Sequence, residues 1–61
     1  MVHVRFEGRS FDLPSGDRRI HAALSDREIL DRVADRLEVP RHRVAGHVVD
    51  RVPGGGLIVR P

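Results

Sequence analysis

The stretch SDREILDRVADRL, residues 25–37, carries the strongest local signal in the sequence. Ser25 precedes Glu28 by three residues, which is the spacing of a capping box, so the stretch predicts a helix that begins at Asp26. Apolar residues recur at helical spacing and form one stripe: Ile29, Leu30, Val33, Ala34 and Leu37. Charged residues occupy most other positions, which indicates that one face of the helix packs and the other is hydrated.

Pro40 limits the length of this helix. A proline disfavours helical geometry at the residue before it, so we expect the helix to stop near Glu38 and residues 40–43 to form one short turn. On the other side of the helix, residues 14–24 show no clean period and open with turn-forming residues. We interpret them as a loop.

Residues 2–6 and 10–13 alternate apolar and polar side chains, which is the period of half-buried strands. Together they predict a β-hairpin whose second strand ends at Pro14, because proline has no amide hydrogen to donate. A Gly8-Arg9 loop would set Phe6 opposite Phe11, Val4 opposite Leu13 and Arg5 opposite Asp12. A loop at Glu7-Gly8 keeps the same two faces.

A second hairpin is predicted after the helix, with strands at residues 47–52 and 57–60 and a turn at residues 53–56. The sequence pattern does not determine which residues of the two strands lie opposite each other. An even loop groups Val48, Val52, Leu57 and Val59 on one face, whereas an odd loop groups Val49, Leu57 and Val59. In both registers some apolar side chains face outward.

The order strand, strand, helix, strand, strand predicts an α+β fold in which one helix packs on a four-stranded mixed sheet. If the last strand lies beside the first, the two are parallel and central, and the second strand of the first hairpin lies at one edge. A chain of 61 residues has room for one domain, residues 1–61.

This order resembles the β-grasp, or ubiquitin-like, family. The resemblance is carried by VHVRFEGRSFDLP at residues 2–14 and by the helix at residues 25–37. It implies a small ubiquitin-like domain. The carriers and modifiers of that family end in a Gly-Gly tail that is activated by adenylation, whereas here Gly54, Gly55 and Gly56 precede LIVRP. A carrier would therefore require trimming to the internal Gly-Gly, and we favour a hairpin turn for these glycines.

The amino-acid composition excludes some kinds of catalytic group. All 11 basic residues are Arg, 9 residues are acidic and no Cys or Lys is present, which is typical of a bacterial-like, GC-rich coding bias. Thiol chemistry and a Schiff-base lysine are therefore excluded. The four histidines, His3, His21, His42 and His47, do not have metal-ligand spacing, and Ser25 is explained as a helix cap. We expect no enzyme, no cofactor and no metal site.

Beside the trimmed carrier, two further functions are open. The first is a protein-interaction module that acts through its sheet face or a strand edge and can form a homodimer, with contacts at Val48, Val49, Val52 and Ile58. The second is a small nucleic-acid-binding regulator whose anion-binding residues are Arg18, Arg19, Arg41 and Arg43. No apolar run is long enough to span a bilayer, so we expect no membrane partner and a cytoplasmic location.

Overall fold

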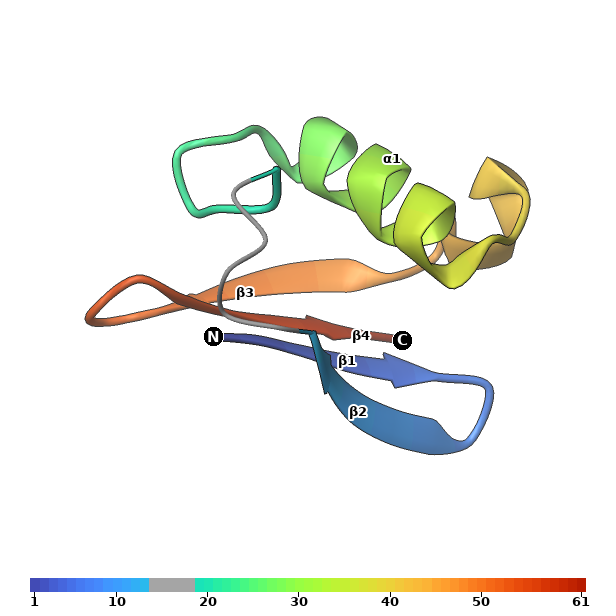
Figure 1. Cartoon of the computed structure of the whole chain (residues 1–61), viewed down its shortest axis with the longest axis horizontal. Coiled ribbons are helices and arrows are strands. Elements are labelled where there is room, and N and C mark those ends of the chain that lie inside the picture. Colours follow the sequence, from blue (N-terminus) through green and yellow to red (C-terminus); the bar gives the residue numbers. More distant parts are fainter. Residues whose placement is uncertain (14–18) are drawn as a thin grey trace.

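The computed structural model describes residues 1–13 and 19–61, and it places one helix over one face of a four-stranded sheet (Figure 1). The elements are β1 (Val2–Phe6), β2 (Arg9–Leu13), α1 (Asp26–Leu37), the short 3-10 helix η1 (Arg41–Val44), β3 (Val48–Val52) and β4 (Gly56–Arg60). The strands follow the order β2-β1-β4-β3. β1 and β4 are parallel and central, and both hairpins are antiparallel. The predicted α+β fold with a mixed sheet is confirmed.

The first hairpin turns at Glu7 and Gly8. Both residues have positive φ, 49° and 80°, as tight two-residue hairpin turns require. In such turns glycine is favoured at the second central position, and Gly8 holds that position in a Glu7-Gly8 loop but not in a Gly8-Arg9 loop. The predicted faces are kept, but His3 now lies opposite Asp12 in place of Arg5.

The second hairpin has an odd loop, which resolves the open register. Val49 lies opposite Val59 and Val52 lies opposite Gly56, so the loop is Pro53–Gly55. Gly54 and Gly55 have φ of 94° and 97°, and the Gly55 N–H donates to the Val52 carbonyl at 3.1 Å. The turn therefore uses glycine where positive φ is needed.

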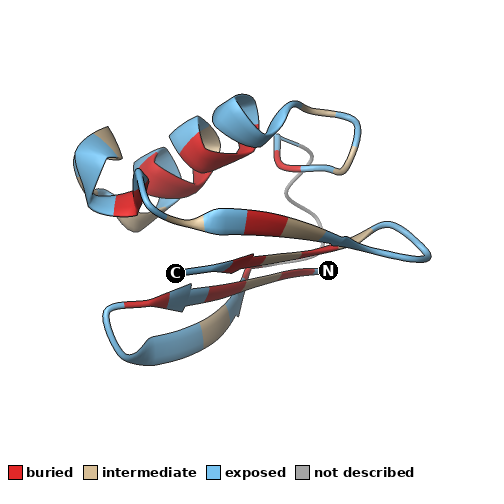
Figure 2. Cartoon of the chain, turned by 180° about the vertical axis from the view of Figure 1, so that it is seen from behind, coloured by how far each residue is buried: buried red, intermediate tan, exposed pale blue. Residues whose placement is uncertain are grey.

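The core lies between α1 and the inner face of the sheet. Figure 2 shows the buried residues on the side of the helix that faces the strands and along the strands themselves. Val4, Ile29, Val33, Val44 and Val59 are completely buried, with an exposed fraction of 0%. The predicted helix stripe is confirmed, because four of its five members are buried and the fifth, Leu37, packs against the same cluster.

Each end of α1 has a defined cap. The Ser25 hydroxyl accepts from the Glu28 N–H at 3.2 Å and the Glu28 carboxylate accepts from the Ser25 N–H at 3.4 Å, so the predicted capping box is present. At the other end, Glu38 is left-handed with φ of 58°. The Glu38 N–H donates to Asp35 and the Val39 N–H to Ala34, which is the pattern of a Schellman motif.

Arg51 joins the sheet to the segment that precedes α1. Its guanidinium group reaches from β3 and donates to the carbonyl oxygens of Ala22 at 3.2 Å and Leu24 at 2.7 Å. It also forms an ion pair with Asp26 in the first turn of the helix. One side chain thus satisfies two main-chain acceptors and one carboxylate, a role that the strand pattern alone did not indicate.

Replacing Glu38 with glycine is expected to raise the free energy of unfolding by about 0.5–1 kcal/mol. The left-handed conformation costs a non-glycine residue roughly 1–2 kcal/mol, and the extra chain entropy of glycine offsets part of that gain. Urea denaturation of Glu38→Gly measures the change. Glu38→Ala removes the same carboxylate and keeps the Cβ atom, so an equal gain in both variants would show that the backbone conformation is not the cause.

Arg51→Met is expected to lower the free energy of unfolding by about 1–2 kcal/mol, because the Ala22 and Leu24 carbonyls lose their charged donor. Methionine keeps the apolar stem of the side chain. Arg27→Met, on the exposed face of α1, is the matched control and should change stability by less than about 0.5 kcal/mol. Equal effects in the two variants would show that Arg51 contributes only its charge.

Candidate functional site

The sheet face opposite α1 is left uncovered by the other elements that the structure describes (Figure 1). The strand register aligns Asp12, His3, Ile58 and Asp50 in one row across this outer face. Two polar pairs lie on it: a hydrogen bond between His3 Nδ1 and Asp12 at 2.7 Å, and an ion pair between Arg60 Nε and Asp50 at 2.7 Å. Most of the outer face is therefore polar, as a hydrated sheet face should be.

The four predicted partner-binding residues separate onto two faces. Val49 is 7% exposed and packs in the core, so its assignment to a contact surface is wrong. The physical reason is the odd loop, which pairs Val49 with Val59 and turns both toward α1. Val48 and Val52 are 45% and 39% exposed and share the outer face with half-buried Ile58. The structure brings these three together.

β3 is also an edge strand. Its inner neighbour is β4, and no described strand pairs with its other edge. Proteins protect such edges with lysine, proline or bulges, but β3 contains no proline or lysine and pairs with β4 without a bulge. Its two charged side chains are engaged, Asp50 by Arg60 and Arg51 by the segment before α1. The opposite edge, β2, carries exposed Arg9 and Asp12.

The predicted anion-binding arginines are mostly bound to acids. Arg18 lies outside the described residues. Arg19 lies 3.7 Å from Asp35, and Arg41 Nε donates to Asp31 at 2.6 Å. These pairs also engage Asp31 and Asp35, two carboxylates that share one face of α1.

Arg43 is held by both a carboxylate and a ring. It donates to Glu7 through Nε at 2.9 Å and through Nη2, and its guanidinium carbon lies 5.5 Å from the centre of the Phe6 ring. The hydrogen bond to Glu7 and the Glu7 charge together raise the pKa of Arg43. Arg43 is therefore a cation already neutralised within the fold, and it offers little attraction to a phosphate chain.

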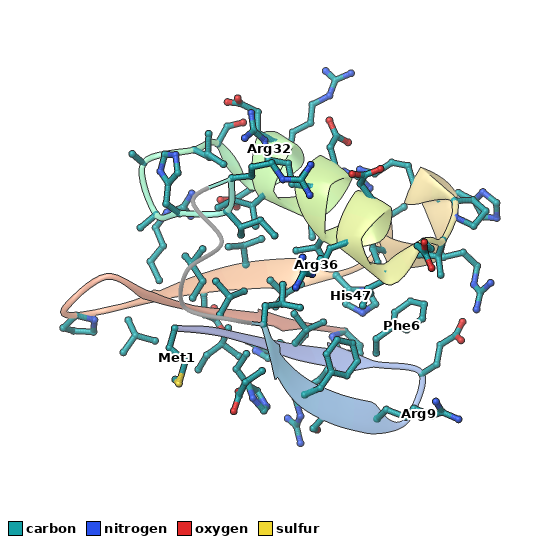
Figure 3. All side chains as sticks on the ribbon, viewed as in Figure 1. Met1, Phe6, Arg9, Arg32, Arg36 and His47 are labelled. Carbon is teal, nitrogen blue, oxygen red and sulfur yellow. The ribbon has the colours of Figure 1, made fainter. Side chains whose placement is uncertain are left out.

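His47 completes the cluster around Phe6. The two rings lie 5.9 Å apart between centres, side by side in Figure 3, and His47 Nε2 lies 3.0 Å from the Arg5 carbonyl oxygen. These contacts give His47 a structural role between η1 and β1. Within residues 1–13 and 19–61, no group of three or more histidine and carboxylate side chains could hold a metal ion.

The glycine run is part of the fold. Gly54 and Gly55 form the turn, and Gly56 begins β4, which lies between β1 and β3. Leu57 and Val59 follow, with exposed fractions of 1% and 0%. Cleavage after Gly55 or Gly56 would remove a central strand and two core side chains, so the geometry does not support a carrier released by trimming.

Comparisons of the chain with protein-family models, with curated proteins and with solved structures give no match. Across the described part of the chain, α-helices are too short and too polar to cross a bilayer.

The pairing of Arg41 and Arg43 with acids gives a prediction about nucleic acid. At about 150 mM salt, roughly 10 μM protein is expected to leave duplex and single-stranded probes unretarded in a gel, because Asp31 and Glu7 already occupy the guanidinium groups of Arg41 and Arg43. A retarded band that Arg41→Gln and Arg43→Gln abolish would contradict this expectation and favour the regulator hypothesis.

Proposed function

We propose that this chain is a small non-enzymatic protein-interaction module that binds an extended segment of a partner protein along the free edge of β3. One observation carries the proposal: β3 combines an unpaired backbone edge with two exposed valines, Val48 and Val52, on one face. Apart from Met1, these valines are the only large apolar side chains classed as exposed in the described residues.

The groups exposed along the edge of β3 indicate which kind of partner segment would bind there. An added strand would bind through main-chain hydrogen bonds, and side chains at alternate positions would set specificity. Because Val48 and Val52 flank Asp50, the partner strand should place apolar side chains beside the valines and a polar or basic one between them. Such a strand would cover the apolar part of the outer face.

A second copy of the chain suits this edge less well. Antiparallel pairing of two β3 strands about Asp50 would set Val48 opposite Val52 twice, but it would also set the two Asp50 carboxylates opposite each other. Like charges directly opposite are destabilising. We therefore assign the edge to a different protein and treat the homodimer as an outcome of the test.

The proposed module is ubiquitin-like and cytoplasmic. The strand order, with parallel central β1 and β4 and with β2 and β3 at the edges, supports the β-grasp resemblance of the sequence. The central position of β4 favours a binding domain over a carrier or modifier.

A photo-crosslinking residue placed at Val52 tests the proposal. In cells that naturally express the chain, it is expected to form a discrete adduct with a partner protein, whereas the same residue at Asp35, on the exposed face of α1, should not. A lysine at Val48 should abolish the adduct, because a charged edge side chain opposes strand addition. Circular dichroism confirms that each variant is folded.

Three outcomes contradict the proposal. Adducts of equal yield from positions 52 and 35 would show non-specific contact, and the absence of any adduct at position 52 would remove the edge as a binding site. An adduct between two copies of the chain would assign the edge to a homodimer.

A further inference from the structure

A hollow of about 360 Å³ lies at the end of the sheet that contains the β1–β2 turn and the end of β4. It is open to solvent and is lined by three arginines, Arg5, Arg9 and Arg60, together with Ser10 and Pro61. Arg9 stands at this end of the sheet (Figure 3), opposite Phe6, which also lines the hollow. We propose that this hollow binds a phosphate monoester.

The strand register brings two of the three arginines, Arg5 and Arg60, onto one face, whereas Arg9 lies opposite Phe6 on the other face of the sheet. Ser10 is the direct partner of Arg5 on β2. On the other side, the β1–β4 register pairs Val4 with Val59, and its continuation sets Arg5 beside Arg60 on the same outer face. Two guanidinium groups on neighbouring strands repel each other. The Asp50 carboxylate offsets part of this repulsion at Arg60, and an anion beside Arg5 would offset more.

Of the three arginines that line the hollow, only one forms an ion pair with an acidic residue that the structure describes. Arg60 is bound to Asp50 at 2.7 Å. By contrast, no ion pair or side-chain hydrogen bond within the described residues engages the guanidinium groups of Arg5 and Arg9. Four other arginines pair with acids: Arg41, Arg43, Arg51 and Arg60. Arg5 and Arg9, which line the hollow, have no acidic partner among the described residues. A local departure from charge pairing is where a binding function is expected.

The groups that line the hollow favour a phosphate monoester as the ligand. Guanidinium groups contact phosphate oxygens through two parallel N–H donors, and the Ser10 hydroxyl can donate to a third oxygen. A monoester dianion carries two charges and three terminal oxygens on one phosphorus. A phosphodiester carries one charge and two such oxygens. A compact site with two unpaired arginines, Arg5 and Arg9, at one end of a sheet therefore matches the monoester dianion better than a nucleic-acid backbone.

Nuclear magnetic resonance titration of the full chain with phenyl phosphate, at about 20 mM salt to limit screening, tests the assignment. The amide signals of residues 5, 8–10 and 60 are expected to shift together. Arg5→Gln and Arg9→Gln should each weaken binding about tenfold or more, since each removes a charged donor. Arg27→Gln, which removes one charge from the exposed face of α1, should weaken it less than about twofold.

Two further measurements distinguish a monoester site from general attraction between the chain and anions. Dimethyl phosphate should bind more weakly than phenyl phosphate, and Val52→Lys should leave phosphate binding unchanged, because β3's free edge is a different surface. The assignment is overturned if Arg27→Gln weakens binding as much as Arg5→Gln, if the diester binds as tightly as the monoester, or if the signals do not shift. None of these results bears on the partner of β3.

Discussion

The structure depends on the packing of α1 against a sheet whose two central strands come from opposite ends of the chain. Ile29 and Val33 of the helix are buried together with Val4 of β1 and Val59 of β4, each with an exposed fraction of 0%. A chain of 61 residues without cysteine has no disulfide to supplement this core. The first and last strands must therefore both be present for the core to close, which makes the segment after the glycine run indispensable.

A single helix can cover only one face of a sheet, and the rest of the surface follows from that limit. The outer face is hydrated, and most of its charged groups are arranged in ion pairs such as Asp50 with Arg60. Two parts of the surface lack this pairing of charges. The valines exposed along β3 supply the proposed protein-binding edge, and the unmatched arginines at the β1–β2 turn supply the proposed phosphate site.

Local signals predicted much of the fold. The spacing of Ser25 and Glu28 located the start of the helix, and Pro40 located its end, because capping and steric exclusion act over a few residues. The candidate site was less predictable. Val49 was assigned to the surface, since hairpin register depends on the loop's parity and three consecutive glycines permit more than one loop length.

The number, type and order of the elements and the apolar stripe of the helix follow from residue patterns, because short-range periodicity and turn chemistry specify them. Which charged groups pair emerges only when the strands assemble. Glu7 and Arg43 are 36 residues apart in the chain, and the neighbours of Arg5 come from β2 and β4. Pairings of this kind arise when strands align, so no local pattern of residues records them.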